Sequence, residues 1–184
     1  MSDTPIARGT QKLHIWQQNL NCSLEGQLDL LYSLKANNYD IAALQEPHID
    51  FLGCTRANPY WSIIYPKHQL KNPKKTRSVI LLNHNISMNN WEDLSIESTD
   101  VTGVRIHGTF WAICVFNIYN DSENNSSLDV VGEFMSVTFL YHRSTLFPSP
   151  CVSWCSRRRK QLSMTLPSIH LLVPSRIHFP SIPT

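Results

Sequence analysis

The feature that most constrains this 184-residue sequence is a strand–helix–strand unit near its N-terminus. Residues 11–19 (QKLHIWQQN) alternate apolar and polar side chains, as a strand with one buried face does. Ser23 can cap a helix in which leucines recur at helical spacing, and residues 39–44 (YDIAAL) form a short apolar run suited to a buried strand. Strands joined in this way run parallel with a right-handed crossover, so the unit predicts an α/β fold.

The sequence that follows is rich in strand patterns. Further strands are expected at residues 60–65, 78–83, 93–97, 101–106 and 111–119. Gly108 stands at an expected hairpin turn, and a second helix is expected to begin near Leu128. These elements predict a mostly β, layered α/β structure.

Composition places the chain among ordinary globular proteins, with 42% hydrophobic and 16% charged residues. No stretch approaches the ~20 apolar residues of a membrane-spanning helix, and residues 1–10 do not resemble a signal peptide. We therefore expect a nuclear or cytoplasmic protein that is not secreted and has no membrane partner. The five cysteines fit neither a disulfide framework nor a zinc motif, so free thiols are expected.

Charge divides the chain into two unlike parts. All fourteen acidic residues lie within residues 1–133, whereas residues 134–184 contain six Lys and Arg and no acid. Prolines and serines are frequent in this second part, and neither strand nor helix periodicity persists. The division predicted is an N-terminal segment 1–10, a domain over 11–135 and an unrelated or disordered tail over 136–184. A wrong reading frame or an unspliced intron would also produce such a tail.

Three residues close apolar strands and carry groups suited to phosphodiester chemistry. Asn19 ends the first strand, Glu46 follows the run IAALQ, and Tyr119 closes the run VFNIY. Carboxylate and amide oxygens hold Mg²⁺, and a tyrosine hydroxyl can donate to a phosphate oxygen. Ligands bind at the carboxyl ends of strands in α/β sheets. A solvated loop glutamate and an aromatic residue packed on the core would also explain Glu46 and Tyr119.

Taken in order, a first strand ending in Asn, then ALQEP, RSVILLN and FNIYND, resemble the endonuclease/exonuclease/phosphatase superfamily. The resemblance is to the apurinic-endonuclease-like domains of non-LTR retrotransposons, and it covers about residues 11–135. It implies the N-terminal half of a layered α/β sandwich that hydrolyses DNA phosphodiesters with magnesium. By resemblance, Glu46 is the metal ligand, Asn19 supports the metal and phosphate site, and Tyr119 contacts the scissile phosphate.

Two motifs that such domains carry are absent from the sequence. One is Gly-Asp-Phe-Asn, whose Asp and Asn handle the nucleophile and the leaving group, and the other is a terminal Asp-His pair. No Asp follows residue 133, so His142, His170 and His178 lack an acidic partner downstream. Residues 131–135 (VGEFM) faintly resemble the first motif but are interpreted as a helix face. A truncated and inactive domain is therefore expected.

Other readings of the sequence stay open. A non-catalytic remnant or a nucleic-acid-binding protein would retain the same motifs, and so would a phosphoesterase of small molecules or lipids. The basic loop of residues 67–77 could contact nucleic-acid phosphates, or could be a solvated loop between strands. DNA is the partner that the resemblance implies, and no feature of the sequence indicates a protein partner.

Overall fold

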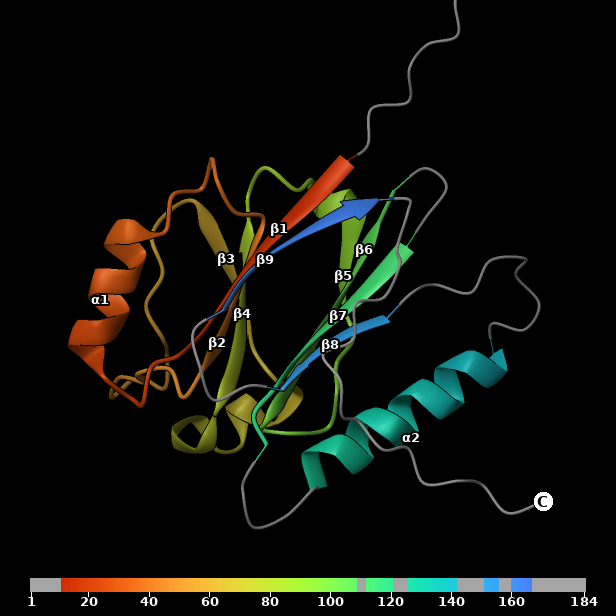
Figure 1. The fold of residues 1–184 in the computed structure, drawn as a ribbon. Coiled ribbons are helices and arrows are strands. Elements are labelled where there is room, and N and C mark those ends of the chain that lie inside the picture. The colour runs from red at the N-terminus through yellow and green to blue at the C-terminus, as the bar shows by residue number, and fades with distance from the viewer. Residues whose placement is uncertain (1–10, 109–111, 121–125, 142–150, 156–159, 167–184) are drawn as a thin grey trace, which may run out of the picture.

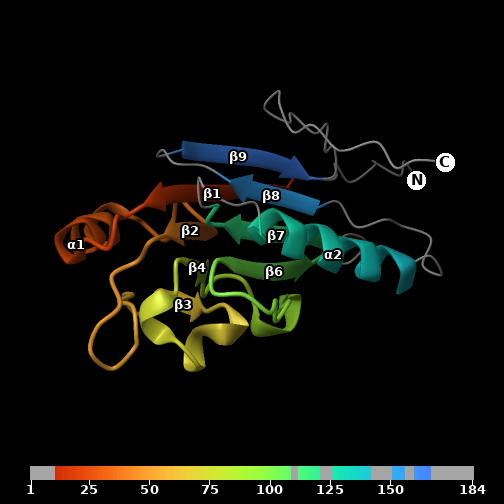
Figure 2. The same ribbon diagram turned by 90° about the horizontal axis from the view of Figure 1, so that it is seen from below.

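The computed structural model describes residues 11–108, 112–120, 126–141, 151–155 and 160–166, with side chains described for residues 12–108, 112–120 and 126–136. Two β-sheets lie face to face, with one helix on the outer side of each (Figures 1 and 2). The result is a layered α/β sandwich, as the sequence predicts. The predicted N-terminal segment 1–10 lies outside the described residues.

The first sheet has five strands in the order β3-β4-β2-β1-β9. Their bounds are β1 Gln11–Asn19, β2 Ile41–Gln45, β3 Trp61–Ile64, β4 Ser78–Asn83 and β9 Lys160–Leu166. Strands β1 and β2 are parallel, with Ile15 opposite Ile41 and Asn19 opposite Gln45. The strand–helix–strand prediction is therefore confirmed. The remaining pairs of this sheet are antiparallel.

The helix between β1 and β2 begins where the sequence predicts. Helix α1 (Leu24–Ser33) is capped by the Ser23 hydroxyl, which accepts a hydrogen bond of 3.0 Å from the Gly26 amide. Its buried residue Leu30 packs with Leu34 and with the outer face of the sheet, where Ala42, Leu44 and Val79 lie. Three 3₁₀ helices complete the N-terminal part of the chain: η1 Lys67–Leu70, η2 Pro73–Lys75 and η3 Met88–Asn90.

The second sheet has four strands in the order β5-β6-β7-β8. Their bounds are β5 Trp91–Asp93, β6 Val101–His107, β7 Ala112–Ile118 and β8 Cys151–Cys155. The strand expected at 93–97 is wrong in position, because β5 ends at Asp93 and Ser95 has a φ of 49°, which no strand contains. Helix α2 (Ser126–Tyr141) covers the outer face of this sheet, and its Phe134 meets Phe116 edge to face at 6.0 Å.

The segment that follows the predicted boundary at 135 differs from the expectation of no regular structure. Helix α2 continues to Tyr141, β8 pairs parallel with β7, and β9 pairs antiparallel with β1. Such edge pairing needs only backbone N–H and C=O groups, which is why the lack of side-chain periodicity did not reveal it. The division into a domain over 11–135 and an unrelated tail over 136–184 stays a prediction. Residues 131–135 lie within α2, so their interpretation as helix is confirmed.

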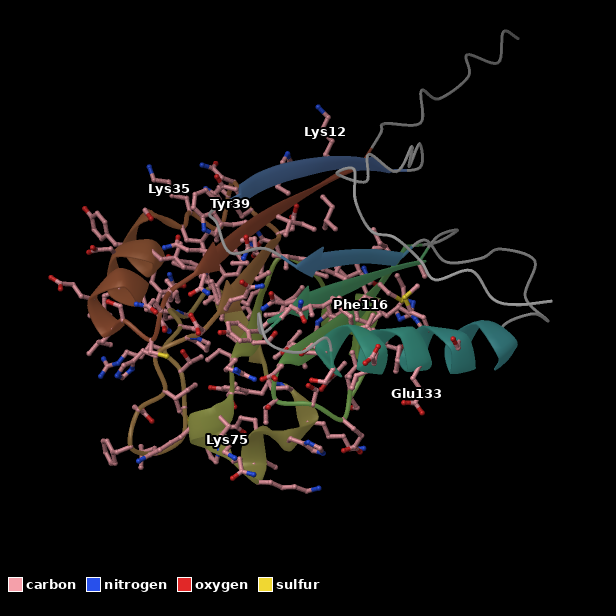
Figure 3. All side chains as sticks on the ribbon, turned by 60° about the horizontal axis from the view of Figure 1, so that its bottom comes forward. Lys12, Lys35, Tyr39, Lys75, Phe116 and Glu133 are labelled. Atoms are coloured by element: carbon pink, nitrogen blue, oxygen red, sulfur yellow. The ribbon has the colours of Figure 1, made fainter. Side chains whose placement is uncertain are left out.

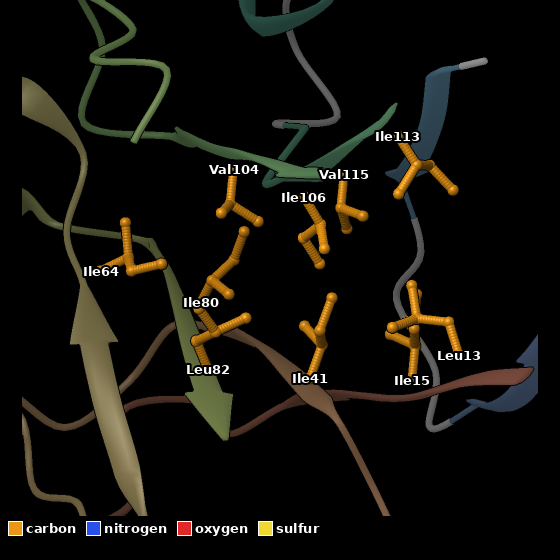
Figure 4. Close-up of a cluster of buried hydrophobic side chains, with 10 residues drawn as sticks. All are labelled: Leu13, Ile15, Ile41, Ile64, Ile80, Leu82, Val104, Ile106, Ile113 and Val115. Carbon is orange, nitrogen blue, oxygen red and sulfur yellow. The ribbon is translucent and has the colours of Figure 1, made fainter. Parts of the chain in front are cut away.

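The space between the sheets is filled by ten aliphatic side chains, which we call the apolar layer (Figure 4). All are buried, and five are fully excluded from solvent. They come from alternate positions of six strands: Leu13, Ile15, Ile41, Ile64, Ile80, Leu82, Val104, Ile106, Ile113 and Val115. Because side chains alternate across a strand, the residue two positions further along each strand also points into the space between the sheets.

Candidate functional site

Each row of inward side chains changes character at the same end of the sandwich. After the apolar layer, the next inward position is Asn117 in β7, Ser78 in β4 and Thr102 in β6. In β2 the small residue Ala43 comes first, and Gln45 holds the inward position after it. All four are at most 2% exposed. We call these four residues the polar bridge.

The polar bridge joins the two sheets by hydrogen bonds. The Asn117 amide donates to the carbonyls of Leu44 and Val79 at 2.8 and 2.9 Å, and the Gln45 amide donates to the Ile118 carbonyl at 2.6 Å. The Ser78 hydroxyl donates to the Asn117 carbonyl, and the Thr102 hydroxyl to the Ser78 carbonyl. Because hydrogen bonds are directional, these contacts fix how the strand ends of one sheet face those of the other.

The sequence-predicted residues follow directly after this bridge. Asn19 is the register partner of Gln45, and Glu46 is the next residue. With strands about 4.8 Å apart and successive Cα atoms 3.8 Å apart, the Cα atoms of Asn19 and Glu46 lie within about 9 Å. Tyr119 follows Ile118, whose carbonyl accepts the Gln45 hydrogen bond. The structure therefore brings all three residues to one end of the sandwich, and all three are half-buried.

Glu46 and the turn beside it adopt a backbone conformation that is uncommon outside glycine. Four non-glycine residues in the described part of the chain have positive φ, and three of them lie here: Asn21 (50°), Cys22 (56°) and Glu46 (47°). The turn is held to β2 because the Cys22 amide donates to the Glu46 carbonyl at 2.8 Å. Such conformations cost free energy and concentrate at functional sites.

Arg77 links the two sides of this region, although sequence reasoning gave it no role in the site and placed it only in the basic loop and at the start of the RSVILLN run. Its carbonyl accepts the Glu46 amide hydrogen at 2.8 Å, and its guanidinium lies 4.5 Å from the centre of the Tyr119 ring. Two guanidinium nitrogens donate to the Asp100 carboxylate at 2.8 and 2.6 Å. The Tyr119 amide in turn donates to the Asp100 carbonyl. A cation thus stacks on Tyr119 in a fixed orientation.

The negative charge of Glu46 affects the pKa of the neighbouring Cys22 thiol. Although Cys22 is exposed, partial desolvation of its thiol raises its pKa, and the negative charge of Glu46 raises it further. The Glu46 carboxylate therefore lies close enough to Cys22 to disfavour a second negative charge. Cys22, Cys54 and Cys114 form no disulfide, which agrees with the prediction for these three.

The residues present fit a weakly held hard cation. Glu46 offers a carboxylate, and the Asn19 amide oxygen accepts the Asn21 amide hydrogen at 2.8 Å while retaining a second lone pair. Within the described ranges, no three His, Cys, Asp or Glu side chains gather in a metal-binding group. One carboxylate and one amide oxygen are compatible with Mg²⁺, which usually keeps several waters.

Solved structures that share this architecture include those of two endonucleases. The endonuclease domain of TRAS1, a telomere-specific non-LTR retrotransposon, superposes with a TM-score of 0.55 at 13% identity, over 78% of this chain and 57% of that domain. The AP endonuclease LMAP from Leishmania major gives a TM-score of 0.56 at 11% identity, over 79% of this chain and 55% of the enzyme. The chain adopts the endonuclease/exonuclease/phosphatase fold. It spans little more than half the length of these two proteins.

Comparison of whole sequences does not detect this similarity of fold. No protein-family model matches it, and no curated protein matches it either. At 11–13% identity the two structures establish the fold alone. Among the described helices, none has the length and apolar character needed to cross a membrane.

Proposed function

We propose that this chain carries the metal-ligand side of an endonuclease/exonuclease/phosphatase site, of retroelement origin, and that the chain alone does not hydrolyse DNA. The observation that carries the proposal is the convergence of Asn19, Glu46 and Tyr119 at the end of the sandwich where the polar bridge joins the sheets. The order of motifs and the architecture shared with an endonuclease domain of a non-LTR retrotransposon support the assignment.

Each residue has a role that its contacts allow. Glu46 would hold Mg²⁺ with the Asn19 amide oxygen, directly or through water. Bound there, Mg²⁺ would supply charge neutralisation for a phosphodiester. Tyr119 would donate a hydrogen bond to a phosphate oxygen, oriented by the Arg77 guanidinium stacked on its ring. Because Asp100 already engages Arg77 at two nitrogens, we assign Arg77 to positioning.

The proposed inactivity comes from the sequence. The 184 residues contain neither Gly-Asp-Phe-Asn nor a terminal Asp-His pair, which would orient the water and protonate the leaving group. Groups that act as one catalytic unit lose most of the rate when any member is removed, often by several powers of ten. Weak binding of Mg²⁺ would survive this loss, because it needs only the Glu46 side of the site.

Two measurements test the proposal. Calorimetric titration with Mg²⁺ should show weak binding that Glu46→Gln abolishes, while Glu25→Gln, which changes an exposed glutamate on α1, leaves it unchanged. In a nicking assay on supercoiled plasmid, the wild-type chain should match Glu46→Gln. If Glu46→Gln bound Mg²⁺ as tightly as the wild type and Glu25→Gln do, the metal role of Glu46 would be refuted. If the wild type nicked the plasmid and Glu46→Gln did not, the proposed inactivity would be refuted.

The proposed retroelement origin has a separate test at the level of DNA. The coding sequence beyond codon 135 should encode Gly-Asp-Phe-Asn, Ser-Asp-His and a reverse transcriptase in another frame if residues 136–184 are out of frame. Those motifs in any frame would support the origin. A continuation that encodes an unrelated domain in every frame would contradict it.

A further inference from the structure

A hollow of about 420 Å³ lies between two loops that each have one end at the candidate site. One loop leaves from Glu46 and the other ends at Arg77, and these two residues are hydrogen-bonded to each other. We call the hollow the loop pocket. Its lining residues are Asp50, Phe51, Leu52, Gly53, Lys71, Asn72, Pro73, Lys74 and Lys75.

The two walls of the loop pocket are fixed against each other. The Gln69 side-chain amide, which is buried, donates to the Gly53 carbonyl at 2.6 Å. Gly53 has a φ of 81°, and a Cβ there would lie 2.8 Å from the Cβ of Pro73. The position therefore requires glycine for its backbone angle and for the close approach of the loops. The pocket is formed before any ligand arrives, which lowers the entropy lost on binding.

The charge of the loop pocket is positive. Lys71, Lys74 and Lys75 form no ion pair with any described residue. The Asp50 carboxylate, by contrast, accepts hydrogen bonds from the amides of Leu52 and Cys54 at 2.9 and 3.0 Å. Figure 3 labels Lys75 on this outer surface of the η1–η2 segment. Three lysines so close together present a phosphate-binding surface, while the one acid beside them is engaged by backbone.

The same pocket presents apolar side chains to solvent. Phe51 is 90% exposed and Leu52 is 71% exposed, although both belong to a loop that is hydrogen-bonded at each end. Exposed aromatic rings beside lysines are the combination that single-stranded nucleic acids bind, since bases stack on the ring while phosphates meet the cations. In a duplex the bases already stack on one another, so the ring would contribute little.

We infer that the loop pocket binds an unstacked base and the adjoining phosphates of a single-stranded nucleic acid, with Phe51 as the stacking surface. This rests on the proposed function in one respect, because it places the bound strand beside Glu46. The Cα atom of Lys75 lies within about 7 Å of that of Arg77, so the strand would continue toward the candidate site. Binding itself requires no metal ion.

The test is fluorescence anisotropy of the full chain in EDTA, with labelled oligothymidylate, oligouridylate and a hairpin duplex of equal charge. Both single strands should bind more tightly than the duplex, and a difference between them identifies DNA or RNA as the preferred source. Phe51→Ala should weaken single-strand binding about tenfold, and Phe51→Trp should retain it. Tyr32→Ala removes a ring that is 92% exposed on α1 and should have no effect.

The role of the lysines is tested by measuring how the affinity for a single strand depends on salt concentration. The Lys74→Ala/Lys75→Ala double variant should reduce the slope of log affinity against log salt by about 1.4, at about 0.7 per phosphate contact with a single strand. Lys12→Ala/Lys35→Ala, which changes two exposed lysines elsewhere, should leave the slope unchanged. Equal affinity for duplex, or no loss on Phe51→Ala, would overturn the inference. The binding assay contains EDTA, so its failure would say nothing about the metal role of Glu46. The Mg²⁺ titration of Glu46→Gln tests that role separately.

Discussion

The two ends of the space between the sheets are built from different chemistry. The apolar layer consists of aliphatic side chains alone, whereas the polar bridge that continues the same strands makes five hydrogen bonds from one sheet to the other. Hydrophobic contact holds sheets together without choosing one alignment, but a hydrogen bond constrains distance and angle. The comparison teaches that this chain places its candidate site where the alignment of the sheets is most narrowly fixed.

The largest effect is expected in the apolar layer. Ile80 is fully buried, and Ile80→Ala should lower the free energy of unfolding by about 2–5 kcal/mol, since it leaves a cavity between the sheets. Denaturant unfolding followed by circular dichroism measures it. Ile80→Val should lose only about 0.5–1.5 kcal/mol, and both variants should retain Mg²⁺ affinity while folded. A layer that tolerated both substitutions equally would not be the packed core described above.

A smaller loss of stability, but a specific loss at the site, is expected from the polar bridge. Asn117→Ala removes the donor to the Leu44 and Val79 carbonyls and should lower the free energy of unfolding by about 1–3 kcal/mol. Its Mg²⁺ affinity should also fall, because the strand end that carries Tyr119 loses its alignment with the one that carries Glu46. An Asn117→Ala protein that is destabilised but binds Mg²⁺ as the wild type does would remove the distinction between the two regions.

Thr102→Val isolates one hydrogen bond of the bridge with little change of volume. It removes the 2.9 Å contact to the Ser78 carbonyl and should lower the free energy of unfolding by about 0.5–1.5 kcal/mol. Thermal unfolding monitored by calorimetry gives the value, with Thr76→Val as a control at a buried threonine whose hydroxyl makes no hydrogen bond to a described residue. A stabilised Thr102→Val chain would show that packing, not the hydrogen bond, dominates at this position.

The smallest effect concerns the thiol beside the site. The charge of Glu46 contributes to the raised pKa of Cys22, so neutralising that charge should lower this pKa and increase the thiolate fraction at pH 8. Glu46→Gln, or Mg²⁺ held by Glu46, should therefore accelerate iodoacetamide alkylation of Cys22 by a few fold. Peptide mass spectrometry reports each cysteine separately, and the exposed Cys54 is the internal reference. Slower alkylation of Cys22 in Glu46→Gln would contradict the assigned electrostatics.

Much of the architecture was accessible from sequence periodicity. Period-2 alternation located β1 at its observed bounds, and the capped leucine repeat located α1. The short β5 was misplaced because Leu94 and Ile96 continue an apolar pattern through Ser95, whose positive φ ends the strand. Strands β8 and β9 were missed because backbone pairing at a sheet edge leaves no side-chain signature in these residues.

The candidate site was predictable only in its strand-end residues. Asn19, Glu46 and Tyr119 stand out because each lies at the carboxyl end of a strand or directly after it. The polar bridge left a weaker signal, namely a polar residue in the inward row of an otherwise apolar strand, as Asn117 is in β7. Arg77 gave none, because its contacts with Tyr119 and Asp100 arise from loops that only the tertiary structure brings together.

The length of chain between the partners of the polar bridge also bears on how the molecule folds. Gln45 and Ile118 are 73 residues apart, as are Leu44 and Asn117, whereas the pairs β3–β4 and β6–β7 are hairpin neighbours in sequence. Local hairpins form in microseconds, but contacts of such separation must wait for closure of a long loop. The candidate site should therefore assemble after the local pairs β3–β4 and β6–β7, because Glu46 and Tyr119 come to the same end of the sandwich only when the long loop between them has closed.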